Sequence, residues 1–484
     1  MNLLQLFAHS LEAKKNTIGL EFGTSLYTFG ELDARSNQTA RLLTSRGFKE
    51  GDRLCVYLEN CIEYIDLFLA CAKLGIIFVP INILYREKEV SHIYKDADPK
   101  DLVAAEEVPG SFPFLSLKEI RSSSSGQSAD PVKIITNGDS IAAIVYTSGT
   151  TGASKGAMLS HNNFISNGIN LVTCWHITGD DRFLLALPLF HVHALANGLH
   201  SWLISGCRMR LLERFEYQKA ADEFITFQPT LFFGVPTIYI RLLDLPAETV
   251  RRIGATMRLF VCGSAPLPAH VLESFQEKYL HTILERYGMT ETLMNISNPY
   301  IGRRRAGTVG VPLPGTSVRI MDQAGSEVRP GEIGELYIKG PNVFTGYWKR
   351  EEATKDAFVN GYFKTGDLGF RDEMDYYTLC GRKSDLIISG GFNIYPREIE
   401  EMLLEQEGIA EVAVVGVPHA LRGEVPVAYI VTREKGLDTA SLEEKCRQSL
   451  ASFKVPKSFI LVERLPRTAL GKVQKHLLPI PELN

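Results

Sequence analysis

The stretch YTSGTTGASKG, residues Tyr146–Gly156, directly follows the apolar run Ile141–Val145. The run contains the β-branched residues that are typical of a buried strand. The stretch combines glycines with serine and threonine hydroxyls and one lysine, Lys155. Because glycine tolerates positive φ and lets the backbone approach a ligand closely, such a loop can direct its N–H groups at phosphate oxygens. A triphosphate is therefore the ligand that this strand and loop suit best.

Two other motifs fit the same stretch less well. A Walker loop requires Gly-x4-Gly-Lys followed by Ser or Thr, but Ser154 stands five positions after Gly149 and Gly156 follows the lysine. Gly152–Gly156 does match the Gly-x-Ser-x-Gly nucleophile elbow of serine hydrolases. That elbow needs its serine directly after a strand, whereas the strand here is expected to end near Tyr146. A serine hydrolase is thus disfavoured, and an ordinary surface loop is the other alternative for this stretch.

Length and composition describe a globular protein of more than one domain. The 484 residues exceed what one compact core holds. A hydrophobic content of 45% with 22% charged residues is ordinary for a soluble protein, and the net charge of −4 carries no nucleic-acid signature. The sequence shows neither an apolar run of roughly 18 residues nor a signal-peptide pattern, and its eight cysteines form no Cys-x-x-Cys. We expect a cytoplasmic protein with no membrane span, zinc site or disulfide framework.

Helical and strand-like segments alternate through the first 115 residues. The expected segments, in order, are a helix over Glu31–Ser45, a strand over Leu54–Leu58, a helix over Glu63–Leu74 and a strand over Ile76–Ile81. Such alternation predicts a largely parallel sheet covered by helices. The polar stretch Arg121–Asp130 is expected to be a loop or linker.

Two histidines follow the next strand-like segment. His191 and His193 would share one face if this segment were extended. A metal site would need a third ligand, and His200 is the nearby candidate. A pocket lined by one of the two histidines is the favoured interpretation.

Further polar motifs are suited to a nucleotide. In ERYGMTET, an aromatic beside a glycine can stack on a flat base, while Thr290 and Glu291 can serve phosphate and Mg²⁺, which prefers oxygen ligands. A plain loop with a buried tyrosine is the alternative for this motif. Asp367, in KTGDL, can accept hydrogen bonds from both ribose hydroxyls. Arg303–Arg305 is expected to be a solvated run without a role.

The character of the chain changes near residues 381–385, and a smaller mixed α/β unit follows. It includes a helix that Pro396 opens and a second helix for which Ser441 and Glu444 are expected to form a capping box. About 100 residues suffice for an independent domain. We therefore predict one domain over residues 1–382 and another over residues 383–484.

Six stretches occur in order between residues 146 and 475: YTSGTTGASKG, GSAPLP, ERYGMTET, YFKTGDLG, GRKSDLIISGGFNIYPREIE and PRTALGKVQK. Taken together, they resemble the acyl-adenylate-forming family of acyl-CoA synthetases. The family's loop usually has proline where this chain has Ser154. Its hinge residue, commonly Asp or Lys, corresponds to Ser384, whose role is left open.

The resemblance implies an α/β fold with a large N-terminal domain of two α/β subdomains and a small β-barrel. A smaller, mobile C-terminal α/β lid domain would carry the catalytic lysine. The implied reaction has two steps: a carboxylate attacks MgATP to form an acyl-adenylate and pyrophosphate, and the thiol of coenzyme A then displaces AMP. Phosphoryl chemistry of this kind depends on positioning and charge neutralisation, which a glycine loop, a lysine and Mg²⁺ supply.

The resemblance also assigns residues. ATP phosphates would be held by Thr147, Ser148, Gly149, Thr150, Thr151, Gly152 and Lys155. Adenine would be framed by Gly263, Ser264, Ala265 and Tyr287, and ribose would be held by Asp367 and Arg382. The implied catalytic residues are Thr290 and Glu291, with Glu291 binding Mg²⁺, and Lys472, which would bridge the carboxylate and the α-phosphate. Gly391 would leave room for the pantetheine arm of coenzyme A.

The residue before the Tyr-Gly-Met-Thr-Glu stretch points to a particular acid. Most relatives lack an arginine there, whereas malonyl-CoA synthetases carry one, as this chain does at Arg286. Malonate keeps a second carboxylate after activation, and burying that group unpaired would cost several kcal/mol. Arg286 offers it a bidentate partner, with His193 beside it. Malonate or methylmalonate is therefore the expected substrate.

Several alternatives stay open from the sequence. Within the same class, the substrate can instead be a fatty or an aromatic acid, with Arg286 merely paired to a nearby acid such as Glu285. Outside the class, a non-catalytic nucleotide-binding protein and the serine hydrolase are the rivals. The expected partners are a small carboxylic acid, ATP and coenzyme A, with no nucleic acid.

Overall fold

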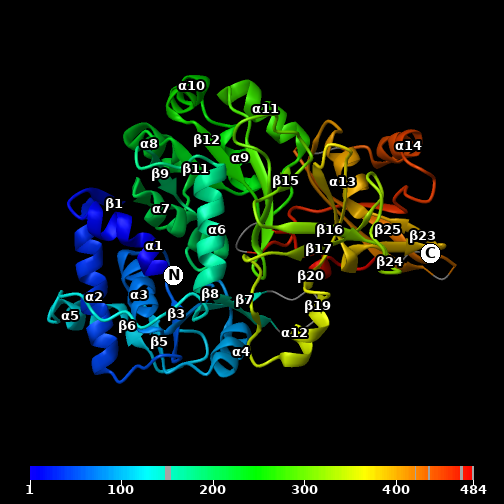
Figure 1. The fold of residues 1–484 in the computed structure, drawn as a ribbon. Helices are drawn as coiled ribbons and strands as arrows, with labels where there is room; N and C mark the ends of the chain where they lie inside the picture. Colours follow the sequence, from blue (N-terminus) through cyan, green and yellow to red (C-terminus); the bar gives the residue numbers. More distant parts are fainter. Residues whose placement is uncertain (148–153, 420, 434–436, 469–471, 482–484) are drawn as a thin grey trace.

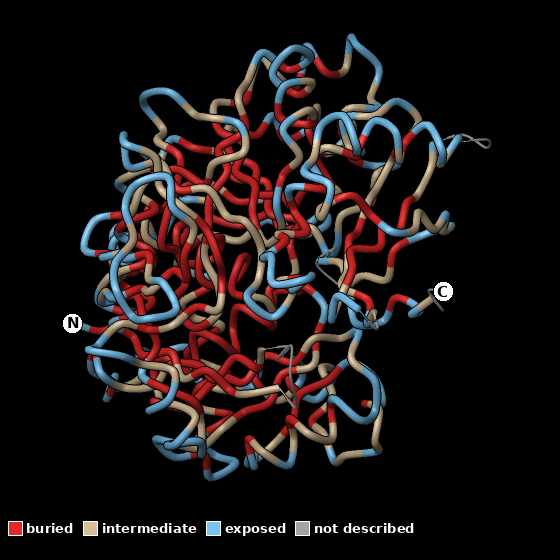
Figure 2. The backbone as a smooth tube through the Cα atoms, turned by 90° about the vertical axis from the view of Figure 1, so that its right-hand side faces the viewer, coloured by how far each residue is buried: buried red, intermediate tan, exposed pale blue. Residues whose placement is uncertain are grey.

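The computed structural model describes residues 1–147, 154–419, 421–433, 437–468 and 472–481. Figure 1 shows a large α/β body that contains the N-terminus and a smaller unit, at the right of the view, that the last part of the chain forms. In Figure 2 the buried backbone runs through the interior of the large body. A mixed α/β fold with a large N-terminal and a small C-terminal domain is thereby confirmed.

The first sheet carries the strand that leads into the glycine-rich stretch. Its strand order is β18 (Gly346–Tyr347), β8 (Lys155–Ser160), β7 (Ile141–Thr147), β4 (Ile77–Pro80), β3 (Arg53–Tyr57), β5 (Asp101–Ala104) and β6 (Leu115–Ser116). The strands from β7 to β6 are parallel, and β8 returns antiparallel beside β7. Parallel strands are covered on both faces, which explains why Ile141–Val145 is almost continuously apolar.

The second sheet brings two of the polar motifs together. Its order is β15 (Val311–Pro312), β14 (Leu293–Ser297), β13 (Leu284–Met289), β12 (Leu259–Cys262), β11 (Leu231–Gly234), β9 (Arg182–Leu185), β10 (Arg208–Leu211), β1 (Ile18–Phe22) and β2 (Ser25–Thr28). β12 and β13 are parallel, with Cys262 opposite Glu285. The residues that follow Cys262 therefore lie beside Arg286.

Helices cover these two sheets, and the expected early elements are confirmed. The predicted helices and strands are observed as α2 (Phe29–Ser45), β3, α3 (Ile62–Leu74) and β4, within two residues of the expected bounds. α3 ends at Gly75, whose φ of +68° makes it the left-handed cap that glycine favours. Other helices are α1 (Leu3–Ala8), α4 (Glu87–Ala97), α6 (His161–Cys174), α7 (His200–Ser205), α8 (Tyr217–Phe227), α9 (Pro236–Leu242), α10 (Ala247–Thr256), α11 (Ala269–Tyr279) and α12 (Glu351–Ala357).

The third sheet is antiparallel and takes the place of the small β-barrel that the resemblance implies. It is built from β16 (Ser317–Met321), β17 (Gly334–Lys339), β20 (Tyr362–Arg371), β19 (Phe358–Val359) and β21 (Tyr377–Arg382). The pairing of β20 with β21 sets Asp367 opposite Arg382. Two candidate ribose-binding residues are thus neighbours in the sheet.

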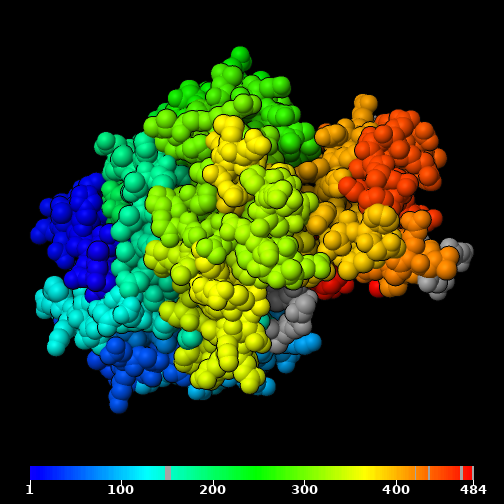
Figure 3. All heavy atoms as spheres, turned by 45° about the vertical axis from the view of Figure 1, so that its right-hand side comes forward, coloured from blue at the N-terminus to red at the C-terminus, as the bar shows by residue number. Residues whose placement is uncertain are grey.

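The C-terminal unit has its own sheet and its own apolar core. The sheet consists of β23 (Phe392–Ile394), β22 (Ile387–Ser389), β25 (Gly423–Thr432), β24 (Ile409–His419) and β26 (Ser458–Leu461), with helices α13 (Pro396–Leu404) and α14 (Thr439–Ser449). Buried residues such as Ile399, Val414 and Leu442 pack together in this unit. In Figure 3 it forms the orange and red lobe set off from the rest of the surface. The boundary between residues 382 and 383 stays a prediction.

Two sequence-based expectations about local structure are wrong. Much of the supposed polar linker Arg121–Asp130 belongs to helix α5 (Leu117–Ser125), because Ser116 and Glu119 form a capping box and Arg121 pairs with the buried Glu63 at 2.6 Å. Helix α14 is capped by Asp438, whose carboxylate accepts the Ala440 N–H, so the box expected from Ser441 is not the cap. Among the described residues, no helix combines the length and apolar character needed to cross a membrane.

Two buried imidazoles make the fold sensitive to acid. His161 is 1% exposed and His200 is fully buried, and burial lowers the pKa of each to about 4. An unfolded histidine titrates near pH 6.5 (about the model-peptide value), so the unfolded chain binds protons that the folded chain does not. We expect the free energy of unfolding to fall by about 1–2 kcal/mol per imidazole as the pH drops from about 7 to about 5.

The test compares the pH dependence of Tm in two variants. His200→Phe keeps an aromatic ring against Phe164, on which His200 stacks at 4.7 Å, and should lose part of the pH dependence. His176→Asn changes an exposed histidine at a φ of 51°, a conformation that asparagine tolerates, and should keep all of it. An unchanged pH profile in His200→Phe would contradict the prediction.

Candidate active site

The two ends of the glycine-rich stretch are fixed in the first sheet. β7 ends at Thr147 and β8 begins at Lys155, and these two residues face each other in the antiparallel register. The Thr147 hydroxyl donates to the carbonyl of Lys155 at 3.4 Å. The other predicted phosphate-binding residues of the stretch, Ser148, Gly149, Thr150, Thr151 and Gly152, lie outside the described residues.

Helix α4 anchors the base of this stretch. The Tyr146 hydroxyl donates to Asp96 at 2.7 Å, and Asp96 also pairs with Arg350 at 2.7 Å. One turn earlier in α4, the Nε2 atom of His92 lies 2.7 Å from the carbonyl oxygen of Ser154. Tyr146 and Ser154, near the two ends of the stretch, are thereby tied to the same helix.

A lysine, an aromatic ring and a carboxylate line up beside the stretch. The Lys155 ammonium lies 4.6 Å from the centre of the Tyr347 ring, and the Tyr347 hydroxyl donates to Glu291 at 3.1 Å. Glu291 is 6% exposed, and burial raises the pKa of its carboxyl. Thr290 stands next to it, in the turn between β13 and β14. Tyr347 was missed by the sequence reasoning, although its place beside Gly346 repeats the aromatic–glycine pattern of Tyr287.

The side chains around Glu291 suit a metal ion that is held mainly by the phosphates of a bound nucleotide. Among the described residues, no group of three or more His, Cys, Asp or Glu side chains could hold a metal ion. Mg²⁺ usually keeps several waters and binds through one or two carboxylates together with substrate phosphates. A single buried carboxylate next to a phosphate-binding stretch fits that arrangement.

Asp367 is the centre of a second polar group. Its Oδ1 accepts from Arg382 Nε at 2.7 Å, and its Oδ2 accepts from the Tyr287 hydroxyl at 2.5 Å. Burial raises the pKa of Asp367, while Arg382 acts in the opposite direction. Each carboxylate oxygen still has a free lone pair, so the group can accept further hydrogen bonds from a diol. The structure thus brings together three residues that the sequence assigned to nucleotide binding.

Lys472 also reaches this group, although it comes from the C-terminal domain. Its backbone is held in a tight loop in which Lys472 N–H donates to the Thr468 hydroxyl at 3.2 Å. The pKa of Lys472 is lowered because neighbouring protein displaces water from the ammonium and because Arg382 repels it, whereas Asp367 and Glu291 act in the opposite direction. The exposed lysine therefore stands within electrostatic range of both polar groups.

The GSAPLP stretch begins where β12 ends and passes directly over Arg286. A Cβ atom placed on Gly263 would lie 2.4 Å from the guanidinium carbon of Arg286, so any other residue there would displace this guanidinium. Ser264 adopts a φ of +72°, and its hydroxyl lies 3.1 Å from Nδ1 of His193. Ala265 is the next residue of the same stretch. The backbone around Gly263 thus forms one wall of a site that contains Arg286 and His193.

Arg286 is a buried cation without a counter-charge. It is 5% exposed, and within the described part of the chain its Nε and Nη2 atoms have no hydrogen-bond partner. Burial lowers the pKa of Arg286 to about 10. Glu285 is the adjacent residue on β13, and successive side chains of a strand point to opposite faces. No ion pair joins Arg286 to Glu285 or to any other acid among the described residues, so the pairing alternative is not observed.

His193 is a second unsatisfied group at this place. It is 1% exposed, and no described residue lies within hydrogen-bonding distance of its Nε2 atom. Burial, with the charge of Arg286 as the next cause, lowers the pKa of His193. The segment is not extended at His193, because this residue opens a π-helix over His193–Leu199. His200 bonds the Leu195 carbonyl at 2.6 Å and stacks on Phe164, so it is not placed as a third metal ligand.

Gly391 occupies an exposed turn between β22 and β23. Its φ is +85°, and a Cβ atom there would meet no atom within 4 Å. None of the described contacts joins Gly391 to the phosphate-binding stretch or to Lys472. The hinge candidate Ser384 is likewise exposed, and its hydroxyl bonds the neighbouring Asp385 at 3.1 Å.

The arginine run is not simply solvated, as the sequence suggested. Arg304 donates to the carbonyls of Pro299 and Tyr300, each at 3.1 Å, and also to the carbonyl of Thr282. Arg305 pairs with Asp372 at 2.6 Å. These arginines fasten the segment after β14 to its surroundings.

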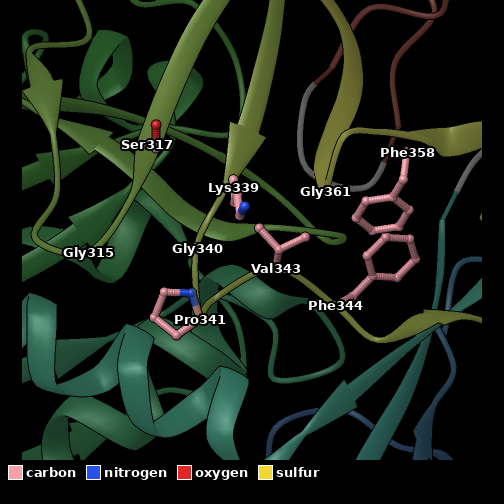
Figure 4. A pocket seen from close by; sticks show the side chains of 9 residues that line it. All are labelled: Gly315, Ser317, Lys339, Gly340, Pro341, Val343, Phe344, Phe358 and Gly361. Atoms are coloured by element: carbon pink, nitrogen blue, oxygen red, sulfur yellow. The ribbon is translucent and has the colours of Figure 1, made fainter.

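A separate surface pocket of about 570 Å³ includes Phe344, which contacts the segment that holds Glu291. Figure 4 shows its lining, which consists of Gly315, Ser317, Lys339, Gly340, Pro341, Val343, Phe344, Phe358 and Gly361. The backbone N–H of Phe344 donates to the Glu291 carbonyl at 2.7 Å. The pocket contains none of the candidate residues and is therefore not the candidate active site.

Comparison with known families decides what this arrangement represents. Residues 7–348 match the AMP-binding enzyme family, and residues 398–472 match the AMP-binding enzyme C-terminal domain. The chain belongs to the AMP-binding enzyme family. The resemblance inferred from the six sequence stretches is therefore confirmed.

Relatives within the family act on different acids. A 2-succinylbenzoate–CoA ligase from Bacillus licheniformis is 36% identical, with 94% of this chain and 95% of the relative covered. A malonate–CoA ligase from Arabidopsis thaliana is 32% identical, with 98% and 88% covered. The crystal structure of ATP-bound MatB from Rhodopseudomonas palustris is 40% identical, covers 98% of both chains and superposes with a TM-score of 0.92. Together the family and these relatives support ATP-dependent, AMP-forming acid–CoA ligase activity.

The hydrogen bond between Tyr347 and Glu291 yields a prediction about ATP binding. Tyr347→Phe keeps the ring under Lys155 but removes the hydroxyl that positions Glu291. A hydrogen bond to a charged group contributes about 1.5–3 kcal/mol, so we expect MgATP to bind about 10- to 100-fold more weakly by calorimetry. Tyr362→Phe is the matched control, because it loses a phenol–hydroxyl bond to Ser317 outside the site. Equal affinities in Tyr347→Phe and the parent would refute the prediction.

Proposed function

We propose that this acid–CoA ligase activates malonate, or a 2-substituted malonate such as methylmalonate. The observation that carries the proposal is the Arg286 guanidinium, which is 5% exposed and has no acid paired with it among the described residues. Leaving a buried charge uncompensated costs several kcal/mol. A substrate with a second carboxylate removes that cost whenever it binds.

The surroundings of Arg286 suit a carboxylate rather than a neutral group. The guanidinium can form two parallel hydrogen bonds with a carboxylate, and His193 Nε2 offers a third polar contact. A neutral imidazole can donate from this atom when its proton is on Nε2. The glycine at position 263 lets the backbone lie against the guanidinium without displacing it.

The position of Arg286 also favours a short diacid. It is adjacent in sequence to Tyr287, which bonds Asp367, and it contacts Gly263 of the stretch assigned to adenine. The second carboxylate would therefore lie close to the nucleotide and to the carboxylate that reacts. A fatty or aromatic acid would leave the guanidinium unpaired. 2-Succinylbenzoate is the second candidate, because a 36% identical relative is a ligase for it.

We infer a mechanism in two half-reactions. An oxygen of one malonate carboxylate forms a bond to the α-phosphorus of ATP, and the bond from that phosphorus to the bridging oxygen breaks, releasing pyrophosphate. The sulfur of coenzyme A then forms a bond to the acyl carbon. The bond from that carbon to AMP breaks, and the thiol proton leaves to solvent. The products are malonyl-CoA, AMP and pyrophosphate.

The proposed roles of the residues follow from their charges and positions. Lys472 neutralises charge between the attacking carboxylate and the α-phosphate, and Lys155 neutralises the leaving phosphates. Asp367 and Arg382 hold the ribose, while Tyr287 orients Asp367. Thr290 and the backbone and hydroxyl groups between Thr147 and Lys155 bind the phosphate oxygens. Gly391 belongs to the surface that admits coenzyme A in the second half-reaction.

Glu291 would hold Mg²⁺ together with oxygens of ATP. The ion supplies charge neutralisation on the phosphates when it is bound. Tyr347 keeps the carboxylate pointed toward Lys155 and the phosphate stretch. The presence of ATP and a magnesium ion in a structure of the Bacillus subtilis o-succinylbenzoate CoA synthetase, 31% identical to this chain, supports this assignment.

A substrate panel tests the proposal. The protein is incubated with MgATP, coenzyme A and, separately, malonate, methylmalonate, succinate, 2-succinylbenzoate, butyrate or benzoate, and AMP and acyl-CoA are measured by mass spectrometry. Acyl-CoA formation with malonate or methylmalonate, well above that with succinate and butyrate, supports the proposal. Preference for butyrate, benzoate or 2-succinylbenzoate would overturn it.

Lys472 should matter for one half-reaction only. Lys472→Ala removes the positive charge at the junction of carboxylate and phosphate, so we expect adenylate formation to fall by roughly 100- to 1,000-fold, the usual loss for one electrostatic group. Thioester formation from preformed malonyl-adenylate and coenzyme A should be unchanged, because that step uses a different surface of the lid. A fall of equal size in both half-reactions would show that the lid does not have two working positions.

Arg286 should distinguish malonate from a neutral acid. Arg286→Ala should raise the barrier for malonate by roughly 3–5 kcal/mol, the cost of breaking a buried ion pair. This corresponds to a loss in kcat/KM of about 100-fold to a few thousand-fold. Activity with butyrate should hold or improve, because butyrate carries no group that needs the arginine.

Arg286→Lys serves as the conservative variant. Because an ammonium group cannot form the two parallel hydrogen bonds of a guanidinium, it should recover only part of the malonate activity. A folding defect would depress both acids together. Equal losses on malonate and butyrate would mean that Arg286 is structural.

A further inference from the structure

Arg397 connects the C-terminal domain to the large body through a buried contact. It lies on α13, is 8% exposed, and its Nη1 donates to the carbonyl of Leu379 in β21 at 2.7 Å. Its Nε donates to Glu401, one turn further along α13, at 2.7 Å. The side chain therefore leaves its own domain and ends against a strand of the third sheet.

Glu285, a buried acid of the large body, lies within electrostatic range of this arginine. Its carboxyl is 2% exposed; Oε1 accepts the Leu267 N–H at 3.2 Å, and Oε2 has no partner among the described residues. Burial raises the pKa of Glu285 to about 7. The positive charge of Arg397 is the largest of the influences that lower this pKa. Arg286, on the opposite face of β13, gives Glu285 no such compensation. The lid thus supplies the main counter-charge for a buried acid of the body.

Helix α13 is also fastened to the segment that carries the catalytic lysine. Glu400 of α13 accepts the Val414 N–H at 2.8 Å and pairs with Lys475 at 2.6 Å. Lys475 follows Lys472 by three residues. A fixed position of α13 against the body therefore fixes where Lys472 stands relative to Asp367 and Arg382.

We propose that Arg397 is a positioning residue for adenylate formation, which holds the lid in the arrangement that presents Lys472 to the nucleotide site. The proposal rests on the two-step function proposed above. When the lid moves away, Glu285 loses its counter-charge and the Leu379 carbonyl loses its donor, so the contact stabilises the arrangement seen here.

The test compares Arg397→Met with a matched control in the same domain. Arg447→Met removes another arginine that pairs with a glutamate one turn away on its own helix, at 2.5 Å from Glu443, but reaches no residue of the large body. We expect Arg397→Met to slow adenylate formation by about 10-fold, a typical coupling between sites. Thioester formation from preformed acyl-adenylate should hold or rise, and Arg447→Met should leave both steps unchanged.

A second readout needs no substrate and so separates this proposal from the choice of acid. Hydrogen–deuterium exchange of the free protein should rise in residues 377–382 and 396–404 of Arg397→Met, and not in Arg447→Met. Arg397→Lys should restore part of the protection and of the adenylation rate. In a Glu285→Gln background, Arg397→Met should slow adenylation less than in the parent, because the two groups act on each other.

The outcomes are distinct. Faster exchange with slowed adenylation and a preserved thioester step supports the proposal, whichever acid the panel identifies. Unchanged exchange and unchanged adenylation in Arg397→Met would overturn it. Equal losses in both half-reactions would also overturn it, because the arginine would then be a structural residue of the lid.

Discussion

Arg286 carries a positive charge at a place that water hardly reaches, and neighbouring parts of the site are arranged around that charge. A Cβ at position 263 would displace the guanidinium, and the pKa of His193 lies below its ordinary value because the imidazole is buried and because Arg286 repels a second proton. The described residues provide no acid to compensate Arg286. An uncompensated buried charge costs several kcal/mol, which is why we propose that the substrate supplies a second carboxylate here.

The location of this charge follows from how the strands end. β12 and β13 are parallel neighbours, and in sheets of this type ligands bind beyond the carboxyl ends of the strands. Residues after Cys262 and residues at the end of β13 therefore line the same space. Tyr287, which bonds Asp367, connects this space to the third sheet. The proposed acid site and the proposed nucleotide site are thus adjacent.

The C-terminal domain completes the site through long-range charge and a few buried contacts. Lys472 stands within electrostatic range of Asp367 and Arg382, while α13 of the same domain reaches β21 through Arg397. Under the proposed mechanism the C-terminal domain moves between the two half-reactions, and the loss of one such contact is expected to change the balance between its positions.

The sequence by itself determined the α/β order, the glycine-rich stretch after a buried strand, the family and the Arg286 hypothesis, because these depend on local patterns of apolar, glycine and charged residues. Only the tertiary structure revealed that Tyr347 bonds Glu291, that Arg286 has no acid paired with it among the described residues, and that Arg397 bonds the Leu379 carbonyl. Each of these facts depends on which strands are neighbours and on which face of a strand a side chain lies. Residues such as Glu291 and Tyr347 are far apart along the chain, and no local pattern shows that they meet.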